Sequence, residues 1–210
     1  MKFGIIFDMD GTLWDSAQQV AQAWSGVTKP KLGITVSREE VCRCMGMPMD
    51  KLFQELLPEF DMEKIQPVIK ECEQVENAYL AEHGGKLYPK LVETLQILSG
   101  QYPLYIVSNC QAGYIEAFLE HYKLSGYFQD HICYGDNELQ KGDNIALIMK
   151  RNKLGQAVYV GDIQADYEAA IAGGAEFIHA AYGFGTIHAD VEAIHEFSEL
   201  PVVIAKFLHK

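Results

Sequence analysis

From about residue 87 to residue 180, this sequence alternates between helical and β patterns, and the alternation limits the fold more than any other feature. Apolar runs such as LYIVSN, HICYG, AVYVGD and EFIHAAYG follow amphipathic segments such as PKLVETLQILSG, GYIEAFLEHY, DNIALIMKRN and ADYEAAIAGG. Strands that alternate with helices in this way are typical of a parallel sheet with helical crossovers. The sequence therefore predicts an α/β fold with a doubly wound, Rossmann-like parallel sheet.

One further strand is expected far from the others, in the apolar run GIIF at residues 4–7. The segment after it looks helical throughout, up to a Gly-Gly pair. Because the first run is as apolar as the later ones, we expect it to join their sheet, which makes the helical segment an insertion. The predicted organisation is a sheet-containing core of residues 1–14 and 87–210 and a small all-helical domain of residues 15–86. The stretch from about Asp190 is expected to form a helix and a tail.

The charge of the chain excludes some partners. Its formal net charge of -12, from 17 Lys+Arg and 29 Asp+Glu, argues against general affinity for nucleic acid or an anionic membrane. The sequence has neither a signal-peptide pattern nor an unbroken apolar stretch long enough to cross a membrane, so the expected location is the cytoplasm. Its 5 cysteines are expected to be free thiols there. No interface pattern predicts an oligomeric state.

Polar side chains stand where the predicted strands end, and the C-terminal ends of parallel strands meet at the edge of a sheet where ligands bind. This group consists of Asp8, Asp10, Ser108, Asn109, Asp162 and Asp166, with Lys141 at the start of a following helix. Clustered carboxylates repel one another, and a divalent cation relieves the repulsion. Mg²⁺ is usually bound by a few carboxylates together with substrate phosphate, and a lysine suits the phosphate. The sequence therefore predicts a magnesium and phosphate site.

Four segments carry a resemblance to a known family. In order, DMDGT, SN, a lysine before a helix and GDIQAD resemble the motifs of the haloacid dehalogenase superfamily, and more narrowly its branch of phosphoglycolate phosphatase-like and β-phosphoglucomutase-like proteins. The resemblance covers the whole chain, and the helical insertion is similar to the family's small helical cap. Many relatives have K-P-x-P at the third motif, whereas this chain has KGDN. Lys150 and Lys153 are therefore rivals of Lys141 for the family's lysine.

The resemblance implies catalytic roles for the first motif. Asp8 would attack phosphorus and become an aspartyl-phosphate. Asp10 would protonate the leaving alkoxide and then activate the water that hydrolyses the phosphoenzyme, while Thr12 would support the turn. Dehalogenases and phosphonate hydrolases of the superfamily lack an acid two positions after the nucleophile. The presence of Asp10 therefore favours chemistry on phosphate esters.

The resemblance also implies a set of ligands. Mg²⁺ would be bound by Asp8, the backbone carbonyl of Asp10 and Asp162. Asp166 would help through water or by positioning Lys141. The transferring phosphoryl oxygens would be held by three groups, Ser108, the Asn109 amide and Lys141.

The expected protein is a phosphoric monoester hydrolase, a Mg²⁺-dependent phosphatase of a small phosphorylated metabolite. Substrate choice is expected to depend on the cap loop CRCMGMPMD, where Arg43 is the candidate contact for a substrate carboxylate or a second phosphate. A phosphosugar mutase of the β-phosphoglucomutase type is the alternative, and a non-catalytic phosphate-binding protein on the same fold is the more distant one. The sequence does not identify the metabolite.

Overall fold

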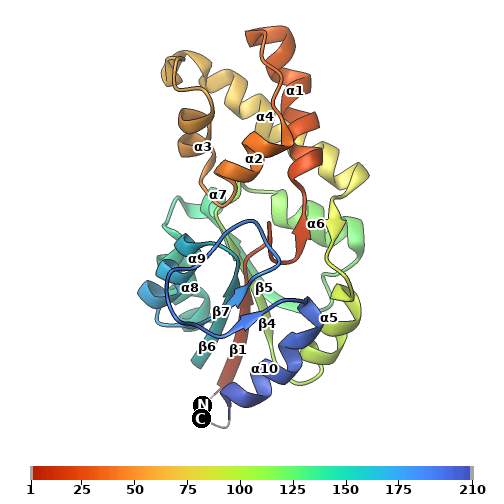
Figure 1. Ribbon diagram of the computed structural model, residues 1–210, viewed down its shortest axis with the longest axis vertical. Helices are drawn as coiled ribbons and strands as arrows, with labels where there is room; N and C mark the ends of the chain where they lie inside the picture. The colour runs from red at the N-terminus through yellow and green to blue at the C-terminus, as the bar shows by residue number, and fades with distance from the viewer. Residues whose placement is uncertain (1, 209–210) are drawn as a thin grey trace.

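A computed structural model describes residues 2–208. At its centre is a six-stranded sheet with the order β5-β4-β1-β6-β7-β8, in which every neighbouring pair is parallel (Figure 1). β1 lies between β4 and β6, so the predicted position of the isolated first strand within the main sheet is confirmed. The strands are β1 (Lys2–Phe7), β4 (Leu104–Ser108), β5 (Phe128–Cys133), β6 (Leu154–Gly161), β7 (Glu176–Ala180) and β8 (Ala193–Ile194).

Helices cover both faces of this sheet, as a doubly wound fold requires (Figure 1). On one face lie α5 (Leu91–Ser99), α6 (Tyr114–Tyr122) and α10 (Leu200–Phe207), and on the other lie α8 (Lys141–Arg151) and α9 (Gln164–Gly173). Successive side chains of a strand point to opposite faces, so Ile5 and Phe7 of β1 join the first core and Ile6 joins the second. Burial on both faces explains why the strands are continuous apolar runs. The predicted fold class is confirmed.

Four helices lie between the first strand and the rest of the sheet in the sequence. They are α1 (Ala17–Leu32), α2 (Arg38–Cys44), α3 (Met49–Leu56) and α4 (Met62–His83), and we refer to them as the helical insertion. The insertion leaves and re-enters the main body through two short antiparallel strands, β2 (Trp14–Asp15) and β3 (Lys86–Leu87). Figure 1 places it beyond the C-terminal ends of the strands. It is therefore positioned to cover the edge where the polar side chains were predicted to gather.

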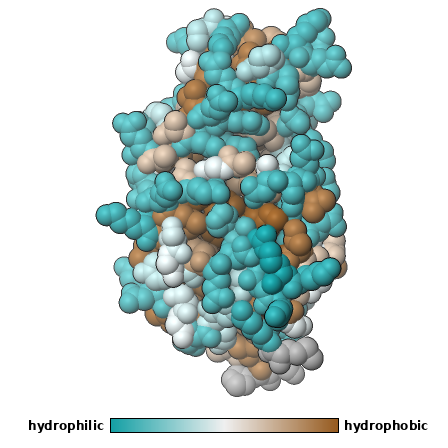
Figure 2. Space-filling model, turned by 180° about the vertical axis from the view of Figure 1, so that it is seen from behind, coloured by the Kyte–Doolittle hydropathy of each residue, from teal (hydrophilic) through white to brown (hydrophobic). Residues whose placement is uncertain are grey.

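The C-terminal part differs from the sequence prediction. The short strand β8 and a 3-10 helix (Phe197–Glu199) precede α10, where we expected only a helix and a tail. A further short helix, α7 (Tyr134–Asn137), follows β5. The surface in the view of Figure 2 is mainly hydrophilic, with apolar residues gathered across its middle. Within residues 2–208, none of the helices is both long enough and apolar enough to span a membrane.

Candidate active site

Three predicted site residues stand at the C-terminal ends of neighbouring strands. Asp8 directly follows β1, Ser108 is the last residue of β4, and Asp162 directly follows β6. The backbone N–H of Asp8 still donates to the carbonyl of Val160 at 2.9 Å, so the strand pairing continues up to the first acid. All three side chains are buried. The central strands therefore fix these groups at one edge of the sheet.

A tight turn follows Asp8. The N–H of Leu13 donates to the carbonyl of Met9 at 2.8 Å, and Gly11 has φ of +85°. A Cβ atom on Gly11 would overlap the carboxylate of Asp162, so this position needs glycine for both its backbone conformation and its close approach. Thr12 is buried in the turn, where its carbonyl accepts a hydrogen bond from Tyr182 Oη at 2.8 Å.

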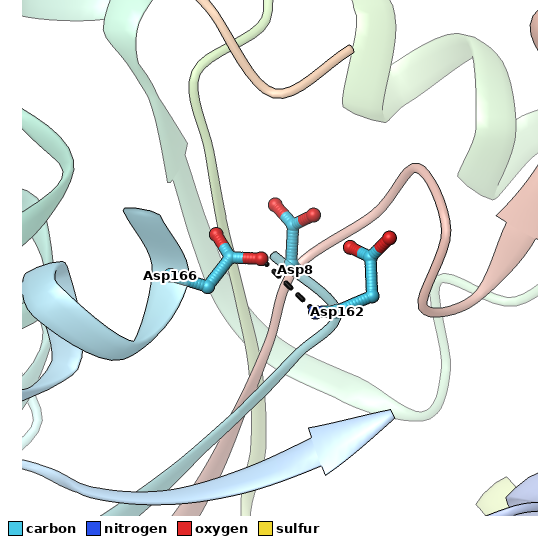
Figure 3. Close-up of side chains that lie close together, drawn as sticks. All are labelled: Asp8, Asp162 and Asp166. Atoms are coloured by element: carbon cyan, nitrogen blue, oxygen red, sulfur yellow. Dashed lines mark hydrogen bonds between the residues drawn. The ribbon is translucent and has the colours of Figure 1, made fainter. Parts of the chain in front are cut away.

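Three carboxylates converge beside the turn, from Asp8, Asp162 and Asp166 (Figure 3). One oxygen from each lies within 4.8 Å of the others. Lys141 is 5% exposed, and its Nζ donates to Asp8 Oδ1 at 2.9 Å and to Asp166 Oδ1 at 2.7 Å. Asp166 Oδ2 accepts the backbone N–H groups of Asp162 at 3.0 Å and of Ile163 at 3.2 Å. Asp166 therefore uses both oxygens to hold Lys141 and the end of β6.

The electrostatics of this group favour an additional cation. Burial raises the pKa of Asp8 to about 7 against the lowering effect of Lys141, and burial together with Asp166 raises the pKa of Asp162. Burial alone would lower the pKa of Lys141, but Asp166 and Asp8 together raise it. One lysine thus faces three carboxylates. A divalent cation would supply the missing positive charge, and the buried oxygen ligands are of the kind that hard cations prefer.

The side chain of Asp10 points to other partners. Its Oδ1 accepts hydrogen bonds from Tyr114 Oη at 2.7 Å and from Ser16 Oγ, and the two hydroxyl oxygens lie 3.0 Å apart. Burial raises the pKa of Asp10 to about 6, against the lowering effect of the bonds from Ser16 and Tyr114. A carboxyl with such a pKa can both give and accept a proton near neutral pH. Sequence reasoning did not find Ser16 or Tyr114.

A cavity of about 420 Å³, counting its opening to solvent, joins the sheet edge to the helical insertion. Asp8, Asp10, Ser108 and Asn109 line it from the main body. The side-chain amide of Asn109 donates to the carbonyl of Gly46 at 2.8 Å, which ties the loop between α2 and α3 to the site. Arg43 is exposed on α2 and does not line the cavity, so its predicted contact with substrate stays a prediction.

A buried carboxyl of the insertion also lines the cavity. Glu76, on α4, is 3% exposed, and its Oε2 accepts a hydrogen bond from Trp24 Nε1 at 2.6 Å. Burial raises the pKa of Glu76 to about 8, against the lowering effect of Trp24, while Asp10 and Glu73 raise it further. Hydrogen bonding by Gln111 opposes this rise.

The raised pKa of Glu76 predicts an effect on stability. Glu76 has a higher pKa in the folded protein than in the unfolded chain. The folded protein therefore loses stability as pH rises from the unfolded pKa toward 8. The Glu76→Gln variant should therefore be more stable than the parent by several kcal/mol above pH 8, and the gain should shrink toward pH 4.5. Urea unfolding across this pH range measures it. Glu82→Gln, on the exposed part of α4, is the matched control, and a gain that does not depend on pH would contradict the assignment.

Comparison with known proteins agrees with this arrangement. Residues 5–180 match the family model of haloacid dehalogenase-like hydrolases. The phosphoglycolate phosphatase of Photobacterium profundum is 30% identical over 195 residues, which are 88% of this chain and 85% of that protein. The phosphoglycolate phosphatase of Aquifex aeolicus is 30% identical over 194 residues, which are 89% of this chain and 88% of that protein.

Solved structures agree in fold. A haloacid dehalogenase-like family protein from Streptococcus pneumoniae superposes with a TM-score of 0.78 at 24% identity, covering 97% of this chain and 98% of that one. A subfamily IA hydrolase of the same superfamily from Geobacter sulfurreducens gives a TM-score of 0.76 at 15% identity, covering 97% of this chain and 100% of that one. The chain belongs to the haloacid dehalogenase-like hydrolase family. The predicted membership is thus confirmed, as is the prediction of a phosphatase, a phosphoric monoester hydrolase.

Proposed function

We propose that this protein is a Mg²⁺-dependent phosphatase that hydrolyses a small phosphorylated metabolite through an aspartyl-phosphate on Asp8. The observation that carries the proposal is the buried group of Asp8, Asp162 and Asp166 around Lys141 at the sheet edge. Burying charged groups is costly unless they are paired, so such a group at a ligand-binding edge is a strong indication of chemistry.

The proposed metal site follows from which oxygens remain available. Both oxygens of Asp166 have hydrogen-bond donors, whereas within residues 2–208 Asp8 and Asp162 each accept side-chain hydrogen bonds through one oxygen. Mg²⁺ would be held by Asp8, Asp162 and the backbone carbonyl of Asp10, with Asp166 in support. When bound, the ion would supply positive charge to the phosphoryl oxygens.

In the first step, an Asp8 carboxylate oxygen forms a bond to phosphorus. The bond between phosphorus and the ester oxygen breaks, and its electron pair leaves with the alcohol, which takes the proton of Asp10. Ser108, the Asn109 amide and Lys141 would hold the phosphoryl oxygens during the transfer. The pKa of Asp10, near 6, and its fixed contacts with Ser16 and Tyr114 support this role as an acid.

In the second step, the deprotonated Asp10 takes a proton from water, and the water oxygen attacks phosphorus. The bond between phosphorus and Asp8 breaks, which releases inorganic phosphate and restores the carboxylate. Residues 15–86 would act as a cap that excludes bulk water and contacts the leaving group. The contact between Asn109 and Gly46 supports closure at this loop.

Phosphate release tests the proposal. The protein should release phosphate from small monoesters only with Mg²⁺, and chelation with EDTA should abolish the release until Mg²⁺ is restored. Phosphoglycolate belongs in the panel because relatives at 27 to 30% identity are named for it. Isomerisation of a phosphosugar primed by its bisphosphate, without net release, would favour the mutase. No reaction with any ester would contradict the proposal.

A further inference from the structure

The cavity lining is acidic beyond the phosphate site as well. Asp8 and Asp10 belong to the phosphate site, and Glu76 adds a third carboxyl group from α4. A second hollow opens beside it and shares Met49, Asn109 and Gln111 with it. Three more carboxylates line that hollow, on Asp50, Glu73 and Glu138. Neither lining contains a lysine, arginine or histidine within residues 2–208.

The basic residues near this region in the sequence lie outside both linings. Lys51 and Lys70 are exposed and line neither space. Lys141 is bonded to Asp8 and Asp166, on the phosphate side. Arg38 donates to Asp15 at 2.6 Å, and Arg43 is exposed on α2. A leaving group that carried a carboxylate or a second phosphate would therefore enter an acidic space whose lining, within residues 2–208, offers no cation.

Glu76 is the buried carboxyl that the helical insertion contributes to this acidic lining. Its carboxyl lines the cavity from α4, while the apolar side chains of Trp24, Met45, Met49 and Leu52 line the same space. An ionised carboxylate among such groups is costly without a counter-charge. The raised pKa of Glu76 agrees with this, because it indicates that the counter-charge is missing from the protein itself.

We propose that the substrate's leaving alcohol carries a positively charged amine, and that this amine pairs with Glu76. This inference rests on the proposed phosphatase function. The apolar side chains would contact the carbon chain between the amine and the ester oxygen, and the acidic rim formed by Asp50, Glu73 and Glu138 would draw cationic esters in. Glu76 is thus the specificity-determining residue on the cap side.

Three esters that differ in the group at the end of a two-carbon chain test the inference at pH 7 with Mg²⁺. They are phosphoethanolamine, with an ammonium, 2-hydroxyethyl phosphate, with a hydroxyl, and phosphoglycolate, with a carboxylate. We expect kcat/KM to fall in that order, with phosphoethanolamine ahead of phosphoglycolate by about thirtyfold or more, the factor for one buried charge pair. A preference for phosphoglycolate would overturn the inference.

Variants assign the preference to Glu76. Glu76→Gln keeps an oxygen for the Trp24 bond but cannot become charged. It should therefore lower the ratio of kcat/KM for phosphoethanolamine to kcat/KM for 2-hydroxyethyl phosphate to about one. Glu82→Gln should leave kcat/KM unchanged for all three esters. An equal loss for all three esters in Glu76→Gln would show a merely structural role and overturn the assignment. If the variant does not fold, the order of the three esters with the parent still decides.

The same assay separates the two proposals. If phosphate is released by the parent and not by Asp8→Asn, but the ammonium ester is not preferred, the phosphatase proposal stands and the inference on the leaving group falls. If neither these esters nor the wider panel gives release that depends on Asp8, the phosphatase proposal itself falls, and the inference falls with it.

Discussion

Replacing Asp8 with asparagine is expected to lower kcat by about four to six orders of magnitude, the loss typical of removing a catalytic nucleophile. An amide oxygen does not form the covalent bond to phosphorus on which both steps depend. Steady-state phosphate release with the best ester of the panel measures the effect.

The fold of this variant should be preserved, which makes the comparison informative. Asparagine has nearly the same shape as aspartate and still offers Lys141 an acceptor oxygen. Burial already raises the pKa of Asp8 to about 7, so losing its charge removes little favourable interaction. Thermal unfolding should therefore give a melting temperature close to that of the parent. A folded Asp8→Asn protein with parental activity would rule out Asp8 as the nucleophile.

Replacing Lys141 with methionine should affect both stability and activity. Methionine fills the space of the lysine stem but leaves Asp8 and Asp166 buried without their shared counter-charge. Breaking a buried ion pair by removing one partner costs about 3–5 kcal/mol. Because the phosphoryl oxygens also lose a cation, kcat should fall by about two to three orders of magnitude. Urea unfolding at pH 7 and phosphate release measure the two effects.

The other lysines near this helix provide matched controls. Lys150, in the last turn of α8, and Lys153, just after it, are both exposed. Lys150→Met and Lys153→Met should leave stability and activity near the parental values, because exposed charges contribute little. If Lys153→Met were inactive and Lys141→Met active, Lys153 rather than Lys141 would be the lysine that binds phosphate.

The sequence predicted the main sheet because its central strands are buried on both faces. Such strands give unbroken apolar runs that need no knowledge of their neighbours, as in GIIF and AVYVG. The edge strand β8 has two residues, Ala193 and Ile194, and so short a strand leaves no run to recognise. Its position depends on pairing with β7, which is a tertiary contact.

The same reasoning explains the site. Asp8, Ser108 and Asp162 come together because parallel strands end at one edge, which sequence order alone implies. The partners of Asp10 come from elsewhere: Tyr114 lies 104 positions away and Ser16 only six, and both contacts depend on how α6 and the insertion pack. No local pattern encodes such packing.

Glu76 was missed although the sequence holds a signal for it. The buried positions of α4 are Ile65, Ile69, Cys72, Glu76 and Leu80, a helical stripe in which one carboxylate replaces an apolar residue. An acidic residue on a helix is usually exposed to solvent. The sequence alone therefore does not indicate that Glu76 is buried, and its position beside the cavity is needed to show it. A charge within an otherwise apolar stripe is thus a clue that sequence reasoning can use.

Trapping the phosphoryl group on the protein tests the central claim most directly. The Asp10→Asn variant with ³²P-labelled 4-nitrophenyl phosphate suits this test, because nitrophenolate leaves without a proton from Asp10 while hydrolysis of the phosphoenzyme still needs that residue. We predict a rapid burst of nitrophenolate, about one per chain, with the label on the peptide that contains Asp8. Label on another residue, or no burst and no label while the parent turns over, would contradict the account.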